Sequence, residues 1–544
     1  MKTLNITLLT ILIIASTSCQ KEDFITDLAT VTQENQFQGN LIRLGEKLEN
    51  PYSVKNMRKA YQNIMEKFQI KSSQIIESTI KTTHLYVRFL PKTQEEFQVL
   101  LDNASLELFD FPLDYIIVGE GTYYHDPKLP NTEITWQYAA VKRDFIFPNL
   151  EYEILEELFL PESIKESTNL KNTEVWAFLD ELEIEALKHT GNYKNNEKSV
   201  LKSNSNASKT TWKPNGTIKV YDDFLDWIPV VGCKARARSW FTVKSDLTDE
   251  NGYFFINHDF KGSVNYSIKW EREDFDIRSG NWGQAYYNGP NYDEKKWNLY
   301  IKKSGLNWTY AHVHRAAYMY WYNNNHGVKT PPKNSRWKRK VKIGVKDESG
   351  RAFHKVQRRF VNFPEIIIYN SQLLINNDGS TTSGNLDSKE IYNTTIHELA
   401  HCSHWDLNRT TYLLADDIVV ESWALGVAYV FTNYEYGSDI YDWNYFADFQ
   451  VIKNHLEGEY TPLVVDLIDN INQRVVYDSP RNSVNWLTRR VRPMDRVTGF
   501  NLEQIENALK SSKTLIDWRD NLKRLYNIST DEKIDELFDN YINL

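Results

Sequence analysis

The sequence predicts a multidomain α+β protein: an N-terminal α/β accessory region, a small all-β sandwich and a mainly α-helical C-terminal domain. Three observations predict it. The 544 residues can supply several hydrophobic cores. Helical and strand periodicities mix in the first part, and short alternating strands precede long helical patterns. The expected segments are a leader at 1–18, a tether at 19–40, the accessory region at 41–197, a linker at 198–212, the sandwich at 213–275 and the C-terminal domain at 276–544.

Composition and charge narrow the class of protein. Hydrophobic residues make up 41% and charged residues 25% of the chain, which is ordinary for a soluble globular protein. The net charge of −9 argues against nucleic acid as a partner, because phosphate binding needs a positive field. The three cysteines, Cys19, Cys233 and Cys402, lie far apart and indicate no disulfide framework.

The first residues, "MKTLNITLLTILIIASTSC", have the plan of a signal peptide. Lys2 supplies a positive charge, a mostly apolar run follows at 4–15, and small residues come next. The run is too short for a membrane-spanning helix. The ending "STSC" resembles a bacterial lipobox, although Ser16 stands where Leu is commonest. That resemblance implies that Cys19 becomes the lipidated N-terminal residue.

The residues that follow Cys19 favour display on the cell surface. "QKEDF" resembles the short signals that send some Gram-negative lipoproteins to the outer face of the outer membrane. The alternative is a tether in the periplasmic leaflet. No other stretch approaches ~18 continuous apolar residues, so the lipid is the only membrane contact that we expect.

The accessory region mixes helices and strands. "SVKNMRKAYQNIMEKF" has apolar residues at helical intervals after a capping Ser53. "THLYVRFLP" alternates like a strand that the proline ends. "TQEEFQVLLDN" predicts a helix with Thr93 as N-cap and Glu96 three positions on. No catalytic constellation is visible in this region.

Short alternating strands follow a linker that is rich in Ser, Asn and Lys. They resemble the transthyretin-like β-sandwich found beside carboxypeptidases, in which Thr-Asp-x-x-Gly-x-Phe joins two strands. The matching residues are Thr248, Asp249, Gly252 and Phe254. The resemblance implies a structural or regulatory module. We expect Cys233 to pack inside it as a small apolar residue.

The C-terminal domain begins with helical and strand patterns. "HVHRAAYMYWYNN" predicts a helix, and "VKIGV" and "PEIIIYN" predict strands. "DSKEIYNTTIHELAHCSHWDLN" predicts a helix with Asp387 as N-cap and Glu390 three positions on. A second helix, "DDIVVESWALGVAYVFTN", follows after a loop of about ten residues, and the last part of the chain is mostly helical.

The first of these helices carries His-Glu-x-x-His. Residues i and i+4 share one helical face, so His397 and His401 project together at a separation that suits tetrahedral zinc. Glu398 is rotated by about 100° and can reach a water on the metal without binding the metal. Zinc lowers the pKa of such a water towards ~7, and a carboxylate can pass its proton to a leaving amine. Cys402 points off this face, and we expect it to be a buried packing residue.

A catalytic zinc ion usually has three protein ligands. Glu421 is the best candidate for the third, because it lies 20 positions after His401 on the next predicted helix. A helix-loop-helix hairpin can bring its carboxylate back over the first helix. His404, which follows His401 by three, is an alternative, and so are Asp416 and Asp417.

"HELAH" and "ESWA" are similar to the motifs of the gluzincin metallopeptidases, the group that contains thermolysin and the zinc aminopeptidases. The resemblance implies a zincin-like catalytic domain in which His397, His401 and Glu421 bind zinc and Glu398 is the general base. The chain departs from the thermolysin-like pattern at Leu425, where those members have an aspartate. The glycine-rich motif of the aminopeptidases is not evident either.

The motifs together favour a zinc-dependent peptidase that acts on a protein or peptide substrate and is held to the membrane by its lipid. The oxyanion that develops in peptide hydrolysis also needs a donor. The candidates are Tyr429, Tyr434, Tyr436, His455 and Tyr477. The alternative function is a non-enzymatic surface lipoprotein that binds peptide or glycan. The intact Glu398 favours the enzyme, because a binding module has no need of the base.

Overall fold

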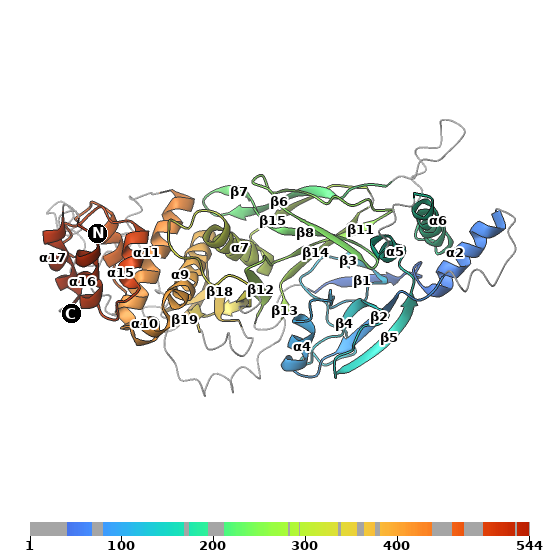
Figure 1. The fold of residues 1–544 in the computed structure, drawn as a ribbon, viewed down its shortest axis with the longest axis horizontal. Coiled ribbons are helices and arrows are strands. Elements are labelled where there is room, and N and C mark those ends of the chain that lie inside the picture. The colour runs from blue at the N-terminus through green and yellow to red at the C-terminus, as the bar shows by residue number, and fades with distance from the viewer. Residues whose placement is uncertain are drawn as a thin grey trace, which may run out of the picture.

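Helices and several small sheets share the chain, as expected of the mixed α+β class. The structure is a computed structural model that describes residues 41–67, 80–167, 173–193, 211–280, 283–292, 294–335, 339–355, 364–375, 381–437, 460–472, 493–527 and 530–542. The expected leader, Cys19, the tether and most of the expected linker lie outside these residues. The molecule is elongated, with the first strands at one end and the last helices at the other (Figure 1). No helix in the described ranges combines the length and apolar character needed to cross a membrane.

Small antiparallel sheets and helices form the N-terminal region. The strands are β1 (Arg43–Lys47) paired with β3 (Tyr115–Gly119), and β2 (His84–Leu90) between β4 (Gln137–Lys142) and β5 (Glu151–Leu158). The helices are α2 (Val54–Lys67), α4 (Gln94–Leu101), α5 (Pro161–Ser167) and α6 (Thr173–His189). Both predicted caps are confirmed. Ser53 Oγ accepts from the Asn56 amide at 3.1 Å, and Thr93 Oγ1 accepts from the Glu96 amide at 3.3 Å.

The next strands form two facing sheets. One contains β6 (Asn215–Asp222), β7 (Asp226–Pro229), β10 (Tyr253–Phe255) and β15 (Trp297–Ile301), and the other contains β8 (Lys234–Ser239), β9 (Thr242–Leu247), β11 (Val264–Lys269) and β14 (Tyr286–Tyr292). Tyr266 in the second sheet packs on Phe254 and Trp297 in the first, with ring centroids 6.0 and 5.2 Å apart. Strands β14 and β15 lie beyond residue 275, so the sandwich takes in more of the chain than the alternating pattern at 213–275.

The turn between β9 and β10 shows why its sequence is Thr-Asp-x-x-Gly-x-Phe. Thr248 Oγ1 accepts from the Cys233 amide, and Asp249 Oδ1 accepts from the Tyr253 amide, both at 2.8 Å. Gly252 has φ +73°, and a Cβ there would lie 2.4 Å from the Ile218 carbonyl oxygen. Phe254 and Cys233 are buried in the core. The similarity to transthyretin-like modules remains a prediction, and each matching residue has a local structural role.

A mixed sheet follows, and the sequence predicted two of its strands. Its strands are β12 (Phe275–Ser279), β13 (Gly283–Gln284), β16 (Val341–Ser349), β17 (Phe353–His354), β18 (Ile366–Ile375) and β19 (Thr381–Asn385). Strands β12, β16 and β18 are parallel, and β17 and β19 pair antiparallel with β18. Both expected strands are confirmed: "VKIGV" lies within β16, and the last five residues of "PEIIIYN" begin β18. Ile366, Ile367 and Ile368 are fully buried, as is usual for a parallel strand covered on both faces.

The helices of this half are packed on the sheet and on one another. They are α7 (Leu306–Tyr322), α9 (Ser388–Leu407), α10 (Arg409–Leu414), α11 (Asp417–Tyr436), α13 (Leu463–Ile468), α15 (Leu502–Leu509), α16 (Leu515–Leu525) and α17 (Asp531–Ile542). Helices α7 and α9 contact each other and the sheet. A continuous hydrophobic core runs from Ile218 in the sandwich to Tyr541 in α17, whereas the N-terminal region has its own clusters. The sandwich and the helices therefore share one core.

A buried ion pair ties the sandwich to α7 and α11. The Asp222 side chain is fully buried at the end of β6, where its Oδ2 accepts from Arg315 at 2.8 Å and from the Tyr436 hydroxyl at 2.9 Å. Burial alone would raise the pKa of Asp222, but the Arg315 guanidinium and the Phe224 amide lower it below its ordinary value. The carboxylate is therefore charged in the folded protein and satisfied from several sides.

We expect Asp222→Asn to destabilise the protein by about 1.5–3 kcal/mol at neutral pH, because the buried Arg315 loses one of its two anionic partners and keeps only Glu435. The depressed folded pKa means that the contribution of Asp222 is present above the unfolded pKa of about 3.9 and is lost as the pH falls through the folded value. The urea midpoints of the variant and the wild type should therefore differ at pH 7 and become equal in acid. The control is Asp259→Asn, an exposed partner of Lys213 whose loss should cost less than about 1 kcal/mol. Equal midpoints for the two variants at pH 7 would contradict this account.

Candidate metal centre

Helix α9 begins where the sequence predicts. Asp387 accepts from the Glu390 amide at 2.8 Å and Glu390 accepts from the Asp387 amide at 2.8 Å, which completes a capping box. The next residue, Ser388, is tied to the sandwich: its amide donates to Asp223 at 2.9 Å, and its hydroxyl accepts from the Asp223 amide at 3.0 Å. These bonds fix where α9 starts and therefore which residues it turns inward.

Three donor atoms from α9 and α11 meet in a buried triangle. His397 Nε2 lies 3.1 Å from His401 Nε2 and 3.2 Å from a Glu421 carboxylate oxygen, and His401 Nε2 lies 3.3 Å from the same oxygen. All three side chains are at most 3% exposed. Zinc bonds of about 2.1 Å at tetrahedral angles place neighbouring ligand atoms about 3.4 Å apart. The three donor atoms therefore have the spacing of ligands around one zinc-sized ion.

The electrostatics of the triangle also suit a cation. Burial alone would raise the pKa of the Glu421 carboxyl, but the His401 and His397 imidazoles lower it to about 2. Glu421 is therefore an anion in a nearly water-free place, where an unpaired charge would be very costly. A divalent ion that binds all three groups would supply the missing positive charge.

Helix α11 packs against α9 and against α13. A Cβ at Gly426 would lie 2.3 Å from the Val464 side chain, so only glycine lets α13 approach α11 so closely. The Ser422 and Thr461 hydroxyls share a hydrogen bond of 2.7 Å in the same buried layer. Glu421 directly precedes Ser422, and these contacts hold its turn of α11 in place beside His397 and His401.

The alternative third ligands do not lie with His397 and His401. His404 is buried, and its ring meets the Tyr412 ring edge-on with centroids 5.0 Å apart. Burial, with a smaller effect from His401, lowers the pKa of His404 to about 3. Asp416 and Asp417 are exposed at the start of α11. Among the described residues none of these three joins His397 and His401, and Glu421 does.

Glu398 and His354 lie next to the donor triangle. Glu398 is fully buried beside His397 on α9, and it is not a member of the donor triangle. His401 Nδ1 is buried without a hydrogen-bond partner among the described residues. Leu425 provides no such partner, in contrast to the aspartate of thermolysin-like enzymes. Instead the His354 ring lies nearly parallel to that of His401, at 9° and 6.4 Å between centroids.

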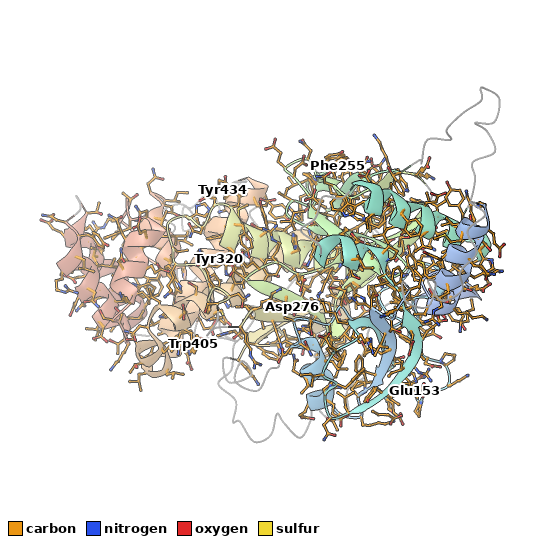
Figure 2. The ribbon with its side chains drawn as sticks, turned by 45° about the vertical axis from the view of Figure 1, so that its right-hand side comes forward. Glu153, Phe255, Asp276, Tyr320, Trp405 and Tyr434 are labelled. Carbon is orange, nitrogen blue, oxygen red and sulfur yellow. The ribbon has the colours of Figure 1, made fainter. Side chains whose placement is uncertain are left out.

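Two of the tyrosines expected to stabilise an oxyanion lie in other surroundings. Tyr436 is part of the Asp222 and Arg315 cluster, and Tyr434 is exposed on the outside of α11 (Figure 2). Tyr429 is half-buried on the same helix. His455 and Tyr477 lie outside the described residues.

Tyr460 also lies near the triangle, and the candidates from the sequence did not include it. Its ring centroid lies 6.1 Å from that of His397, and its side chain is 6% exposed. The hydrogen bond between Ser422 and Thr461 fixes the residue next to it. Tyr460 is far from the His-Glu-x-x-His motif in the chain, and no spacing rule distinguishes it from the other 31 tyrosines.

Comparisons with protein-family models, curated proteins and solved structures find no match to this chain. The similarity to gluzincins therefore remains a prediction from the motif.

We expect Glu421→Gln to lower the affinity of this centre for added zinc by more than about 100-fold, because a neutral amide is a much poorer ligand. His404→Gln should leave the affinity unchanged. Competition with a chromophoric chelator measures both variants. Retention of zinc by Glu421→Gln together with its loss from His404→Gln would assign the third position to His404.

Proposed function

We propose that the chain is a zinc-dependent metallopeptidase that hydrolyses peptide bonds of a protein or peptide substrate. The observation that supports this most is the donor triangle of His397, His401 and Glu421, whose spacing and charge suit a catalytic zinc ion. Two imidazoles and one carboxylate with an open fourth position make up the ligand set of hydrolytic zinc sites.

Each residue has a definite task in this reaction. His397, His401 and Glu421 would hold the zinc ion, which would supply a Lewis acid for the scissile carbonyl and a water with a pKa lowered to about 7. Glu398 accepts the proton of the attacking water and gives it to the departing amine. Burial of Glu398 keeps competing water away from this transfer. The substrate loses its C–N bond and gains the elements of water.

We assign the stabilisation of the oxyanion to Tyr460. Its ring lies beside His397, so the phenol can approach the oxygen on which negative charge develops. The neighbouring Thr461 is bonded to Ser422, and this contact holds the segment against α11. Donors that are already in place act more strongly than donors that must reorganise.

We also propose that the enzyme works at the outer membrane, with the lipid on Cys19 as its anchor. The signal peptide plan and the "STSC" sequence support this location, and "QKEDF" favours the outer face over the periplasmic leaflet. The net charge of −9 fits a partner other than nucleic acid.

We expect Glu398→Gln to lower kcat for peptide hydrolysis by about 10²–10⁴-fold while its zinc content stays unchanged, because only the proton carrier is lost. A zinc chelator should abolish the wild-type activity, and added zinc should restore it. Turnover of a library of unstructured peptides measures both effects. A chain that binds zinc and peptides without cleaving them would favour the non-enzymatic lipoprotein, and undiminished cleavage by Glu398→Gln would contradict the mechanism.

We expect Tyr460→Phe to lower kcat by about 10²–10³-fold with little change in KM, as loss of one oxyanion donor does. Tyr434→Phe is the matched control, because this exposed tyrosine should leave both constants unchanged. Steady-state kinetics on one cleavable peptide compare them. Equal rates for Tyr460→Phe and wild type would exclude Tyr460 as the donor.

A further inference from the structure

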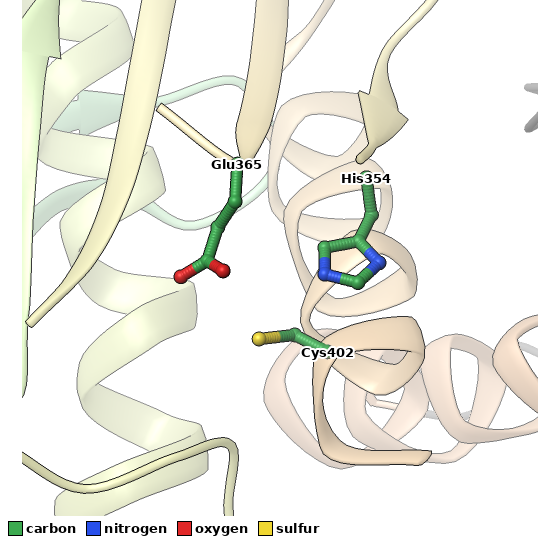
Figure 3. A group of neighbouring side chains, drawn as sticks. All are labelled: His354, Glu365 and Cys402. Atoms are coloured by element: carbon green, nitrogen blue, oxygen red, sulfur yellow. The ribbon is translucent and has the colours of Figure 1, made fainter. Parts of the chain in front are cut away.

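A second group of metal-binding side chains lies behind the first centre. Cys402, His354 and Glu365 point toward one another, and each offers a ligand atom within 4.8 Å of the other two (Figure 3). All three are buried, with Cys402 fully inaccessible and Glu365 1% exposed. None of them belongs to the triangle of His397, His401 and Glu421, so the two groups share no ligand.

The fold brings these residues together from distant parts of the chain. His354 ends strand β17 and pairs with Ile366, the first residue of β18. Glu365 directly precedes β18, and its carbonyl accepts from the Lys355 amide at 2.7 Å. This pairing places His354 and Glu365 side by side at the edge of the sheet. Helix α9 contacts both β17 and β18, and it contributes Cys402 from the face beside His401.

The donor set is suited to zinc. A thiolate, an imidazole and a carboxylate are all zinc ligands, and the thiolate favours zinc over magnesium or calcium. The charges balance as well, because a thiolate and a carboxylate together neutralise a divalent cation. Burying these groups around a cation costs far less than burying the charges separately.

We propose that Cys402, His354 and Glu365 bind a second zinc ion with a structural role. This ion cross-links the β17–β18 edge to α9. The His354 ring lies nearly parallel to that of His401 with centroids 6.4 Å apart, so the ion would also fix a neighbour of the first centre. Because no ligand is shared, the two ions differ from the bridged pairs of two-metal hydrolases, which lie about 3.5–4 Å apart. This inference does not depend on peptidase activity.

The test is the metal content of the full chain, purified with its thiols reduced, and the spectrum of its Co²⁺-substituted form. We expect two ions per chain and a thiolate-to-metal charge-transfer band in the near ultraviolet. Cys402→Ser should lose one ion and the band. Cys233→Ser, which changes the other buried cysteine, should keep both. If Cys402→Ser fails to fold, Glu365→Gln should lose the same ion.

The outcomes separate this site from the proposed active site. Glu421→Gln should lose the other ion and keep the thiolate band. The inference would be overturned if Glu421→Gln lost the thiolate band while Cys402→Ser kept it. A wild-type chain with a single ion and no thiolate band would overturn it as well. A thiolate band in wild type and Glu421→Gln with no peptide hydrolysis by any form would support the second site and reject the peptidase.

Discussion

The burial of the Glu421 carboxylate against two imidazoles is the constraint on which the rest of the site depends. A charged carboxylate with its neighbours about 3.2 Å away and almost no water is stable only if positive charge compensates it. A divalent ion satisfies all three groups at once, and the spacing of their ligand atoms suits such an ion.

The remainder of the fold serves to place those atoms. The capping box of Asp387 sets the start of α9, and Gly426 allows α13 to pack closely against α11. The sandwich takes part as well. Asp223 bonds the first residue of α9, and Asp222 bonds Tyr436 near the end of α11. The sandwich, which the sequence presents as a separate module, therefore fixes the first turn of α9 and the last turn of α11.

Local rules allowed much of the site to be predicted. Helical spacing put His397 and His401 on one face, and the position of Glu421 on the following helix was enough to propose their meeting. Local patterns could not predict contacts between distant segments. Tyr460 is brought to His397 by packing, and β14 and β15 return to the sandwich after the chain has entered the other sheet. Cys402 is buried as expected, but His354 and Glu365, which face it, are brought there by a strand pairing that no periodicity reveals.

The most direct test of the central claim is anomalous scattering at the zinc absorption edge from crystals of the full chain grown with zinc. The account predicts a peak at about 2.0–2.2 Å from His397 Nε2, His401 Nε2 and a Glu421 carboxylate oxygen. Zinc bound by His404 instead of Glu421, or a crystal that holds zinc only at other places, would contradict it.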